Sequence, residues 1–408
     1  MILREVEVRG RVVDVRVTDD VVAEVGRKLK PRAEDEVIEG RGGALLPGLH
    51  DHHLHLRALA AARASVSCRR GLDDLRSAPG ERVRGVLFAG SVDRHELDRV
   101  EPRRPVRVQH RSGALWMLNS AALAELEPLP HLPGVERDAD GRPTGRLWRL
   151  DHLLRGTWPP IGDLAALGRE LASYGITGVT DATPDLTDAP PVPQQVTLLG
   201  RRKLLLHDHD LPDVDTLAAA VRERHDAGLP VAVHCVTRDA LLITLAVLDE
   251  VGRLPGDRIE HGAIVPDPAA LRGLTVVTQP GFLADRGDDY ARDVDEVDLP
   301  HLYPYAGLLA AGVDVVASSD APYGPVDPWV VMHAAAHRAL LPTERVPAAT
   351  VLEGYLRDGD LEPRTIAVGS SADLVLLHLP LSEALRELDH SAVRATWIGG
   401  QRLWGDAT

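Results

Sequence analysis

The sequence predicts an α/β protein: a (β/α)8 barrel of the TIM type beside a small β domain formed by both termini. In the middle of the 408-residue chain, short apolar strand-like runs alternate with helix-forming segments. Ionisable residues follow several of these runs directly, at the strand ends where barrel enzymes carry their chemistry. Both ends of the chain read as short strands. We therefore expect a barrel over residues 47–361 and a discontinuous β domain over 1–46 and 362–408.

Composition narrows the classes of partner. The formal net charge is −15 and the chain has no long basic block, which argues against nucleic acid or an anionic membrane surface. Two cysteines are too few for a disulfide framework, the N-terminus lacks an apolar signal segment, and no apolar run approaches a membrane span. We expect a cytoplasmic protein that acts on a small molecule. The sequence leaves a homo-oligomer open.

The N-terminal residues predict a thin β element. Residues 5–17 alternate with period two around Gly10, and a second run follows at 21–25. Such an element cannot bury a core alone and needs a partner. The partner is expected near the C-terminus, where 372–379 reads as a strand and 393–404 as a hairpin. The alternative is that the two ends add independently to the edges of the central sheet.

The central part supplies about eight strands, which favours a closed barrel over an open doubly wound sheet. No glycine-rich nucleotide fingerprint follows any of them. Strand-like runs are found at 47–56, 84–89, 106–110, 175–181, 201–208, 231–236, 258–261, 275–279 and 313–317. Helix-forming segments are found at 56–70, 119–126, 164–174, 214–227, 239–251, 268–272, 308–311 and 329–340.

The first strand of the barrel region is rich in histidine. If residues 47–56 form a strand, Asp51, His53 and His55 point to one face, whereas His50 and His52 point to the other. Two imidazoles two residues apart on one face can hold a single metal ion. We expect His53 and His55 to be ligands and Asp51 to orient them. The alternative is a polar loop that happens to contain histidines.

Other ionisable residues lie in or directly after later strand-like runs. They are Lys203, His234, His261 and Asp320. Each lies where an apolar run should be buried, and a buried charge or imidazole must be paired or metal-bound. A single histidine of this kind is usually a hydrogen-bonded core residue. Together with the His53–His55 pair, the set predicts a metal-binding centre.

Lys203 has a specific chemical property. Only three of the 46 basic residues are lysines, so this chain generally uses arginine. Arginine stays charged in proteins, whereas a buried lysine can lose its proton. A neutral lysine amine can react with carbon dioxide to give a carbamate, which is an anionic bridging ligand. The alternative is a lysine whose ammonium group extends from the start of the strand to water.

The segment Pro47-Gly48-Leu49-His50-Asp51-His52-His53-Leu54-His55 resembles the opening signature of the amidohydrolase superfamily. Further motifs resemble amidohydrolase family 3, the YtcJ-like metal-dependent hydrolases. They are Asn119-Ser120-Ala121-Ala122-Leu123, Asp140-Gly141-Arg142-Pro143-Thr144-Gly145, Gly175-Ile176-Thr177-Gly178-Val179-Thr180-Asp181, Arg258-Ile259-Glu260-His261-Gly262-Ala263, Thr278-Gln279-Pro280, Ser319-Asp320-Ala321-Pro322 and the C-terminal 371–377. These matches extend over nearly the whole chain.

The resemblance implies a (β/α)8 barrel beside a β-sandwich made from both termini. It also implies hydrolysis of a carbon–nitrogen bond in an amide, formamide or cyclic amide. The cofactor it implies is one or two divalent metal ions, with zinc the expected metal. His53 and His55 would bind the more buried metal with Asp320, which would also transfer the proton. A carboxylated Lys203 would bridge to a second metal. The remaining ligands of that second metal would be His234 and His261.

The chain departs from the family pattern where Gly113 is followed by Ala114 rather than histidine, which leaves the substrate open. Arg111, Trp116 and Tyr323 lie near motif positions and are expected to contact substrate. One alternative function is a deaminase of an aminated heterocycle, and a lactonase also stays open. An alternative of another class is a catalytically inactive barrel that acts as a binding protein. The lysine favours amide cleavage over deamination, because deaminases of the superfamily often lack it.

Overall fold

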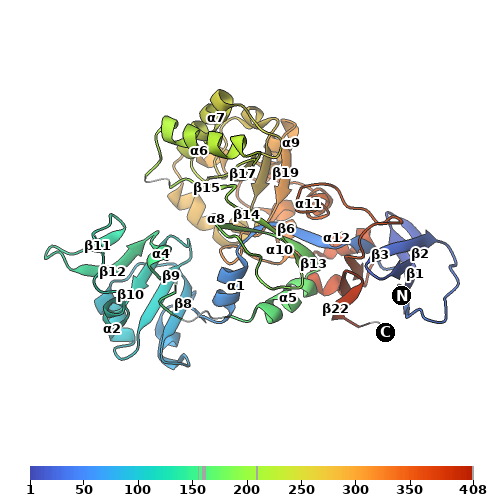
Figure 1. Cartoon of the computed structure of the whole chain (residues 1–408), viewed down its shortest axis with the longest axis horizontal. Helices are drawn as coiled ribbons and strands as arrows, with labels where there is room; N and C mark the ends of the chain where they lie inside the picture. Colours follow the sequence, from blue (N-terminus) through green and yellow to red (C-terminus); the bar gives the residue numbers. More distant parts are fainter. Residues whose placement is uncertain (155, 159–161, 208–209, 407–408) are drawn as a thin grey trace. The chain divides into compact units, whose positions relative to one another are not determined.

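The computed structural model describes residues 1–154, 156–158, 162–207 and 210–406 (Figure 1). The chain divides into two compact units, Met1–Leu56 with Leu164–Thr408, and Arg57–Asp163. Each unit is described by itself below. Residues 57–163, which the sequence assigned to the barrel region, therefore form a unit of their own.

The larger unit contains eight parallel strands in two hydrogen-bonded sheets, which confirms the α/β class. One sheet has the order β14-β13-β6 and the other the order β15-β16-β17-β18-β19. The strands are β6 (Leu49–Leu54), β13 (Ile176–Pro184), β14 (Gln195–Gly200), β15 (Lys203–Leu205), β16 (Ala232–Cys235), β17 (Arg258–His261), β18 (Thr275–Thr278) and β19 (Asp314–Ala317). Just beyond β6 and β19, the amide of Asp320 donates to the carbonyl of His53 at 2.8 Å. The ends of these two strands are thus side by side.

Helices follow most of these strands. They are α5 (Leu164–Ser173), α6 (Val214–Asp226), α7 (Arg238–Val251), α8 (Gly281–Asp293), α9 (Tyr305–Ala310), α10 (Pro328–His337) and α11 (Ala348–Tyr355). Local sequence fixes their ends. Asp213 caps α6 by accepting from the amide of Thr216, and Thr237 caps α7 by accepting from the amide of Ala240. Gly252, with φ of 95°, ends α7 in a conformation that suits glycine.

Two connections in this series contain no helix. Residues 185–194 join β13 to β14, and only Arg201 and Arg202 join β14 to β15. Two residues cannot make a crossover between neighbouring parallel strands. Accordingly β15 pairs with β16 rather than with β14. The run 201–208 is thus strand only at 203–205, residue 208 lies outside the described residues, and β14 is a strand that the sequence analysis missed.

The terminal segments form two antiparallel-rich sheets of four strands each. One has the order β3-β2-β1-β4 and the other the order β22-β21-β20-β5. The strands are β1 (Ile2–Val8), β2 (Arg11–Thr18), β3 (Val21–Gly26), β4 (Val37–Glu39), β5 (Leu45–Pro47), β20 (Leu374–Leu377), β21 (Val393–Ile398) and β22 (Gln401–Gly405), with α12 (Leu381–Glu387) between β20 and β21. One cluster of buried side chains from both sheets, including Leu3, Val15, Leu374 and Trp397, lies between them. Residues from both terminal segments therefore share one buried cluster, and β5 pairs with β20 in one of the two sheets.

Gly48 alone separates β5 of the terminal sheet from β6 of the parallel sheet. A Cβ atom at position 48 would overlap the side chain of Thr177 in β13. Glycine is thus required where the chain passes from one sheet directly into the other.

The smaller unit, residues 57–163, has a six-stranded sheet of its own with the order β11-β12-β10-β9-β8-β7. The strands are β7 (Val66–Ser67), β8 (Val83–Phe88), β9 (Val106–His110), β10 (Leu115–Leu118), β11 (Val135–Arg137) and β12 (Pro143–Trp148). The helices are α2 (Arg94–Val100), α3 (Ser120–Ala124) and α4 (Asp151–Leu154), while α1 (Leu56–Arg63) begins at the boundary. The runs at 84–89 and 106–110 belong to this sheet rather than to the parallel sheets. No helix in the described parts of the chain is long and apolar enough to cross a membrane.

Candidate metal centre

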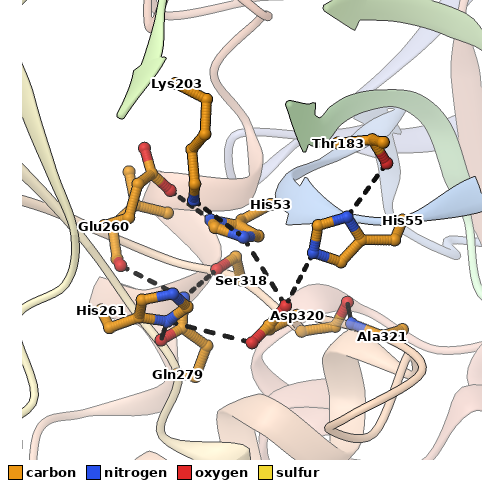
Figure 2. Close-up of polar contacts among 12 residues, drawn as sticks. His53, His55, Thr183, Lys203, Glu260, His261, Gln279, Ser318, Asp320 and Ala321 are labelled. Atoms are coloured by element: carbon orange, nitrogen blue, oxygen red, sulfur yellow. Dashed lines mark hydrogen bonds and ion pairs between the residues drawn. The ribbon is translucent and has the colours of Figure 1, made fainter. Parts of the chain in front are cut away.

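Three predicted ligands converge where β6 and β19 end (Figure 2). His53 and His55 come from the end of β6, and Asp320 follows β19 by three residues. One potential ligand atom from each of the three lies within 4.8 Å of the others. His53 Nε2 is 3.6 Å and His55 Nε2 is 3.4 Å from Asp320 Oδ1. Strand ends far apart in sequence therefore bring two imidazoles and a carboxylate to one point.

The Asp320 carboxylate is suited to a cation. Its backbone φ of 50° is in the left-handed region, and its amide is hydrogen-bonded to the carbonyl of His53. The side chain is buried, and Oδ1 makes no hydrogen bond within the described residues. Burial alone would raise the pKa of Asp320, but the imidazoles of His55, His53 and His261 hold it well below its ordinary value. A buried, ionised oxygen without a donor fits a metal ion.

Strand alternation separates the histidines of β6 as predicted. His50 Nε2 lies 2.9 Å from Thr180 Oγ1, and His52 Nε2 lies 2.9 Å from the carbonyl oxygen of Gly354, so both rings face away from the centre. Asp51 differs from expectation. Its Oδ1 accepts from the backbone amides of His53 at 3.1 Å and Ser319 at 3.2 Å. Asp51 therefore fixes the backbone of both ligand-bearing segments, and these bonds do not orient the imidazole rings.

Three other side chains contact the imidazole rings through Nδ1. Glu260 Oε2 contacts Nδ1 of His53, Thr183 Oγ1 is 3.1 Å from Nδ1 of His55, and Gln279 Oε1 is 2.8 Å from Nδ1 of His261 (Figure 2). Gln279 Nε2 donates to the carbonyl of Val277 and to Ser318, so its oxygen faces the ring. With Nδ1 occupied in each ring, Nε2 is the nitrogen that remains to bind a metal ion.

The sequence analysis missed these three partners. Glu260 directly precedes His261, and alternation along β17 predicted that neighbouring side chains diverge. His261 has a φ of 71°, however, so the strand conformation ends there. Thr183 and Gln279 were ordinary polar residues at strand ends. The available signals were position, because Thr183 lies near the end of β13 and Gln279 directly follows β18, and for Gln279 also the motif Thr278-Gln279-Pro280.

The other predicted ligands lie next to this group. Lys203 Nζ is 3.5 Å from His53 Nε2, and the ring centroid of His261 is 4.9 Å from that of His53. The ring centroid of His234 is 4.5 Å from that of His261. The structure thus brings all six residues into one contiguous cluster. Their individual roles as ligands stay predictions.

Burial determines the charges in this cluster. It lowers the pKa of His53 to about 3, with a contribution from the charge of Lys203, and it also lowers the pKa of His261. Both imidazoles are therefore neutral near pH 7, which is the form that binds metals. Burial likewise lowers the pKa of Lys203. For Glu260, burial would raise the pKa, but the charges of Arg258, His53 and Lys203 hold it well below its usual range.

The three predicted substrate contacts lie in different places. The ring of Tyr323 is 5.8 Å from that of His55 in an edge-to-face arrangement, so this side chain borders the centre. Arg111 and Trp116 belong to the smaller unit. There Trp116 is buried, and its Nε1 donates to Asp151 at 2.8 Å. Contact of any of the three with substrate stays a prediction.

Comparisons with known proteins agree with this geometry. A model described as "Amidohydrolase family" matches residues 36–403. An N-substituted formamide deformylase from Arthrobacter pascens is 25% identical over 508 aligned residues, which cover 95% of this chain and 94% of the relative. The putative amidohydrolase YtcJ from Bacillus subtilis is 23% identical and covers 79% of this chain and 80% of the relative. A metal-dependent hydrolase from Pyrococcus horikoshii has a similar fold, with a TM-score of 0.68 at 18% identity, covering 92% of this chain and 97% of that structure.

Proposed function

Because the chain belongs to the amidohydrolase family, we propose that it is a metal-dependent hydrolase that cleaves a carbon–nitrogen bond of a small molecule. The bond is that of an amide, a formamide or a cyclic amide. The reaction takes place where β6 and β19 end.

The observation that carries this proposal is the convergence of His53, His55 and Asp320. Two imidazole nitrogens and a carboxylate oxygen are the donor types that zinc prefers in catalytic sites, where an open position remains for water. The Nδ1 partners support it, because they leave Nε2 of His53 and of His55 directed towards Asp320. The resident cofactor is one or two divalent ions, and zinc fits this donor set.

Asp320 is the proposed proton carrier. A divalent cation bound here would lower the pKa of water to near 7 and polarise the substrate carbonyl. Asp320 accepts the proton of the attacking water and delivers it to the leaving nitrogen. Asp320 is ionised at neutral pH and can therefore accept a proton, and its Oδ1 lies 3.4 Å from Nε2 of His55 and 3.6 Å from Nε2 of His53.

Lys203, His234 and His261 are proposed to complete a second metal position. Burial lowers the pKa of the Lys203 amine, which favours the neutral form that reacts with carbon dioxide. A carboxylated Lys203 would then bridge the two ions. The proximity of its Nζ to His53 Nε2 supports this role.

The architecture proposed for this function is a closed barrel beside a β-sandwich. Closure is supported by the hydrogen bonds that link the ends of β6 and β19, and the sandwich by the shared apolar cluster of the two terminal sheets. A closed barrel would gather all the proposed ligands at its carboxyl end.

The first substrates to test are N-substituted formamides, because a relative with that name aligns over 95% of this chain. A deaminase of an aminated heterocycle is the second candidate, since the same centre can attack an amidine carbon. The two reactions differ in product: deformylation releases formate and an amine, whereas deamination releases ammonia.

The decisive experiment is a hydrolysis screen with zinc-loaded protein. It covers N-formyl amines, N-acyl amines, cyclic amides and aminated heterocycles, with formate, amine and ammonia measured separately. We expect turnover of a carbon–nitrogen substrate that is lost on chelation and restored by zinc. Full turnover by metal-free protein would contradict the proposal. Failure to bind metal after supplementation would favour a non-catalytic binding protein.

A further inference from the structure

We propose that Glu260 is a positioning residue that holds His53 in the tautomer presenting Nε2 to the metal, and that Arg258 holds Glu260 in place. This inference rests on the proposed metal centre and deepens it. It concerns the geometry of the protein's own side chains, and zinc affinity tests it without any substrate.

The first step is the placement of Glu260 and Arg258 on β17. Side chains two apart on a strand share a face, so Arg258 and Glu260 point the same way. In the sheet, Glu260 pairs in register with His234 of β16, and both are thus neighbours of the centre. Glu260 is fully buried, and its Oε2 contacts His53 Nδ1 (Figure 2).

The second step is the hydrogen-bond chemistry of that contact. An ionised carboxylate can only accept, so Nδ1 of His53 must carry the proton. In the neutral ring, the lone pair then lies on Nε2, the atom that faces Asp320 Oδ1 at 3.6 Å. The corresponding partners of His55 and His261 are a hydroxyl and an amide. Glu260 is the one carboxylate of the three, and a carboxylate partner also makes the ligand nitrogen more basic.

The third step is what orients Glu260 itself. The Nε of Arg258 donates to Glu260 Oε1, and its Nη2 donates to the carbonyl of His52 at 2.9 Å. Arg258 is buried as well, with an exposed fraction of 2%. One carboxylate oxygen is therefore used by Arg258 and the other by His53. Both donors require an acceptor, and only a carboxylate offers one to each.

This arrangement predicts an unusual effect of Glu260→Gln. Glutamine has one acceptor oxygen, which the charged Arg258 should take, because charge-assisted hydrogen bonds are the stronger ones. The amide NH₂ then faces His53 and forces the proton onto Nε2. We expect zinc affinity to fall by about 10- to 100-fold, the range found when partners of metal-bound histidines are changed.

The matched variant is the double substitution Arg258→Met with Glu260→Gln. Without the charged competitor, the glutamine oxygen is free to accept from His53 Nδ1 and to restore the original tautomer. Replacing a buried ion pair by uncharged side chains is often tolerated. We expect zinc affinity to recover most of the loss.

The experiment uses the full-length chain of all variants. Zinc affinity is measured by competition with a chromophoric chelator, the His53 tautomer by ¹⁵N chemical shifts of the metal-free protein, and folding by circular dichroism. Support is a changed tautomer and weak zinc binding in Glu260→Gln, both reversed in the double variant. Wild-type zinc affinity with an unchanged tautomer in folded Glu260→Gln would overturn the inference. So would an equal loss in both folded variants. An inactive wild-type protein would count against the proposed function alone.

Discussion

Asp320 combines two properties at a single residue. Its left-handed backbone places the carboxylate beside His53 and His55, and its buried Oδ1 has no hydrogen-bond donor within the described residues. Unlike Asp51, whose Oδ1 accepts from two backbone amides, Asp320 directs Oδ1 at Nε2 of His55 and of His53, at 3.4 and 3.6 Å. The carboxylate is instead available to a cation and to a proton.

Replacing Asp320 by asparagine should therefore abolish most of the activity. The amide has similar size but cannot accept the water proton, so we expect kcat/KM to fall by about 10²- to 10⁴-fold. The measurement is steady-state kinetics on the substrate found in the screen, together with the zinc content of the variant. A near-normal rate would refute the proposed role of Asp320.

His52 and His53 are neighbours in the chain, but their side chains lie on opposite faces of β6. His52 contacts the carbonyl of Gly354, whereas His53 lies beside Asp320. We expect His53→Ala to lose metal, because it removes a proposed ligand. We expect His52→Ala to keep metal but to lose about 1–3 kcal/mol of stability, because the carbonyl of Gly354 loses its partner. Zinc stoichiometry and chemical denaturation of both variants test this. Equal zinc loss in the two would show that strand alternation does not separate their roles.

At the scale of single elements, Gly48 alone joins β5, which belongs to a terminal sheet, to β6, which belongs to a parallel sheet. The strand that carries His53 and His55 is thereby anchored at its start by the terminal sheet. At its other end, the amide of His55 donates to the carbonyl of Ala321, and the carbonyl of His53 accepts from the amide of Asp320, in the segment after β19. The position of the ligand pair is thus fixed from both sides by backbone contacts.

Gly48→Ala should disturb this element. Its Cβ would overlap Thr177, and overpacking of this kind costs about 1–3 kcal/mol. Gly287→Ala is the matched control, because no atom lies within 4 Å of a Cβ at that position in α8. We expect the control to be neutral or to stabilise by up to about 1 kcal/mol. The measurement is thermal unfolding of both variants. Equal stability of Gly48→Ala and Gly287→Ala would show that the backbone at residue 48 relaxes to accommodate the Cβ atom.

The elements show how far the sequence could predict this structure. The sequence was sufficient to predict five of the proposed ligands, because each lies at the end of an apolar run, and the ends of parallel strands meet at one edge. They are His53, His55, His234, His261 and Asp320. The role of Glu260 could not be predicted beside that of His261, because neighbouring side chains on a regular strand point to opposite faces, and only the positive φ of His261 lets both reach the cluster. The strands at 83–88 and 106–110 could be predicted as strands, but the sequence did not show that they belong to a separate sheet. Their alternation with helices has the same period as that of the parallel sheets.

At the scale of the whole molecule, residues from β6, β15, β16 and β17 and from the segment after β19 meet in one cluster. A metal ion bound there would link segments that are far apart in the chain, and it would bind the folded state only. Metal binding and global stability should therefore be coupled.

Zinc should stabilise the folded protein in proportion to its affinity. At a free concentration 100 times the dissociation constant, we expect about 2.7 kcal/mol of additional stability. Chelator-treated protein should melt at a lower temperature and recover on titration with zinc. A melting temperature that does not respond to zinc would contradict a site assembled from distant segments.

The insertion of residues 57–163 between β6 and β13 also has a consequence for folding. These two strands pair in the sheet, yet Leu54 and Ile176 are separated by the whole smaller unit. Closing a flexible loop of that length costs about 4 kcal/mol in chain entropy. Within the smaller unit, however, Gly162 lies against Ala60, so its two ends are already close together. We expect this unit to fold first and to bring β6 and β13 within reach, so that pairing of the ligand-bearing strand is a late, fast event.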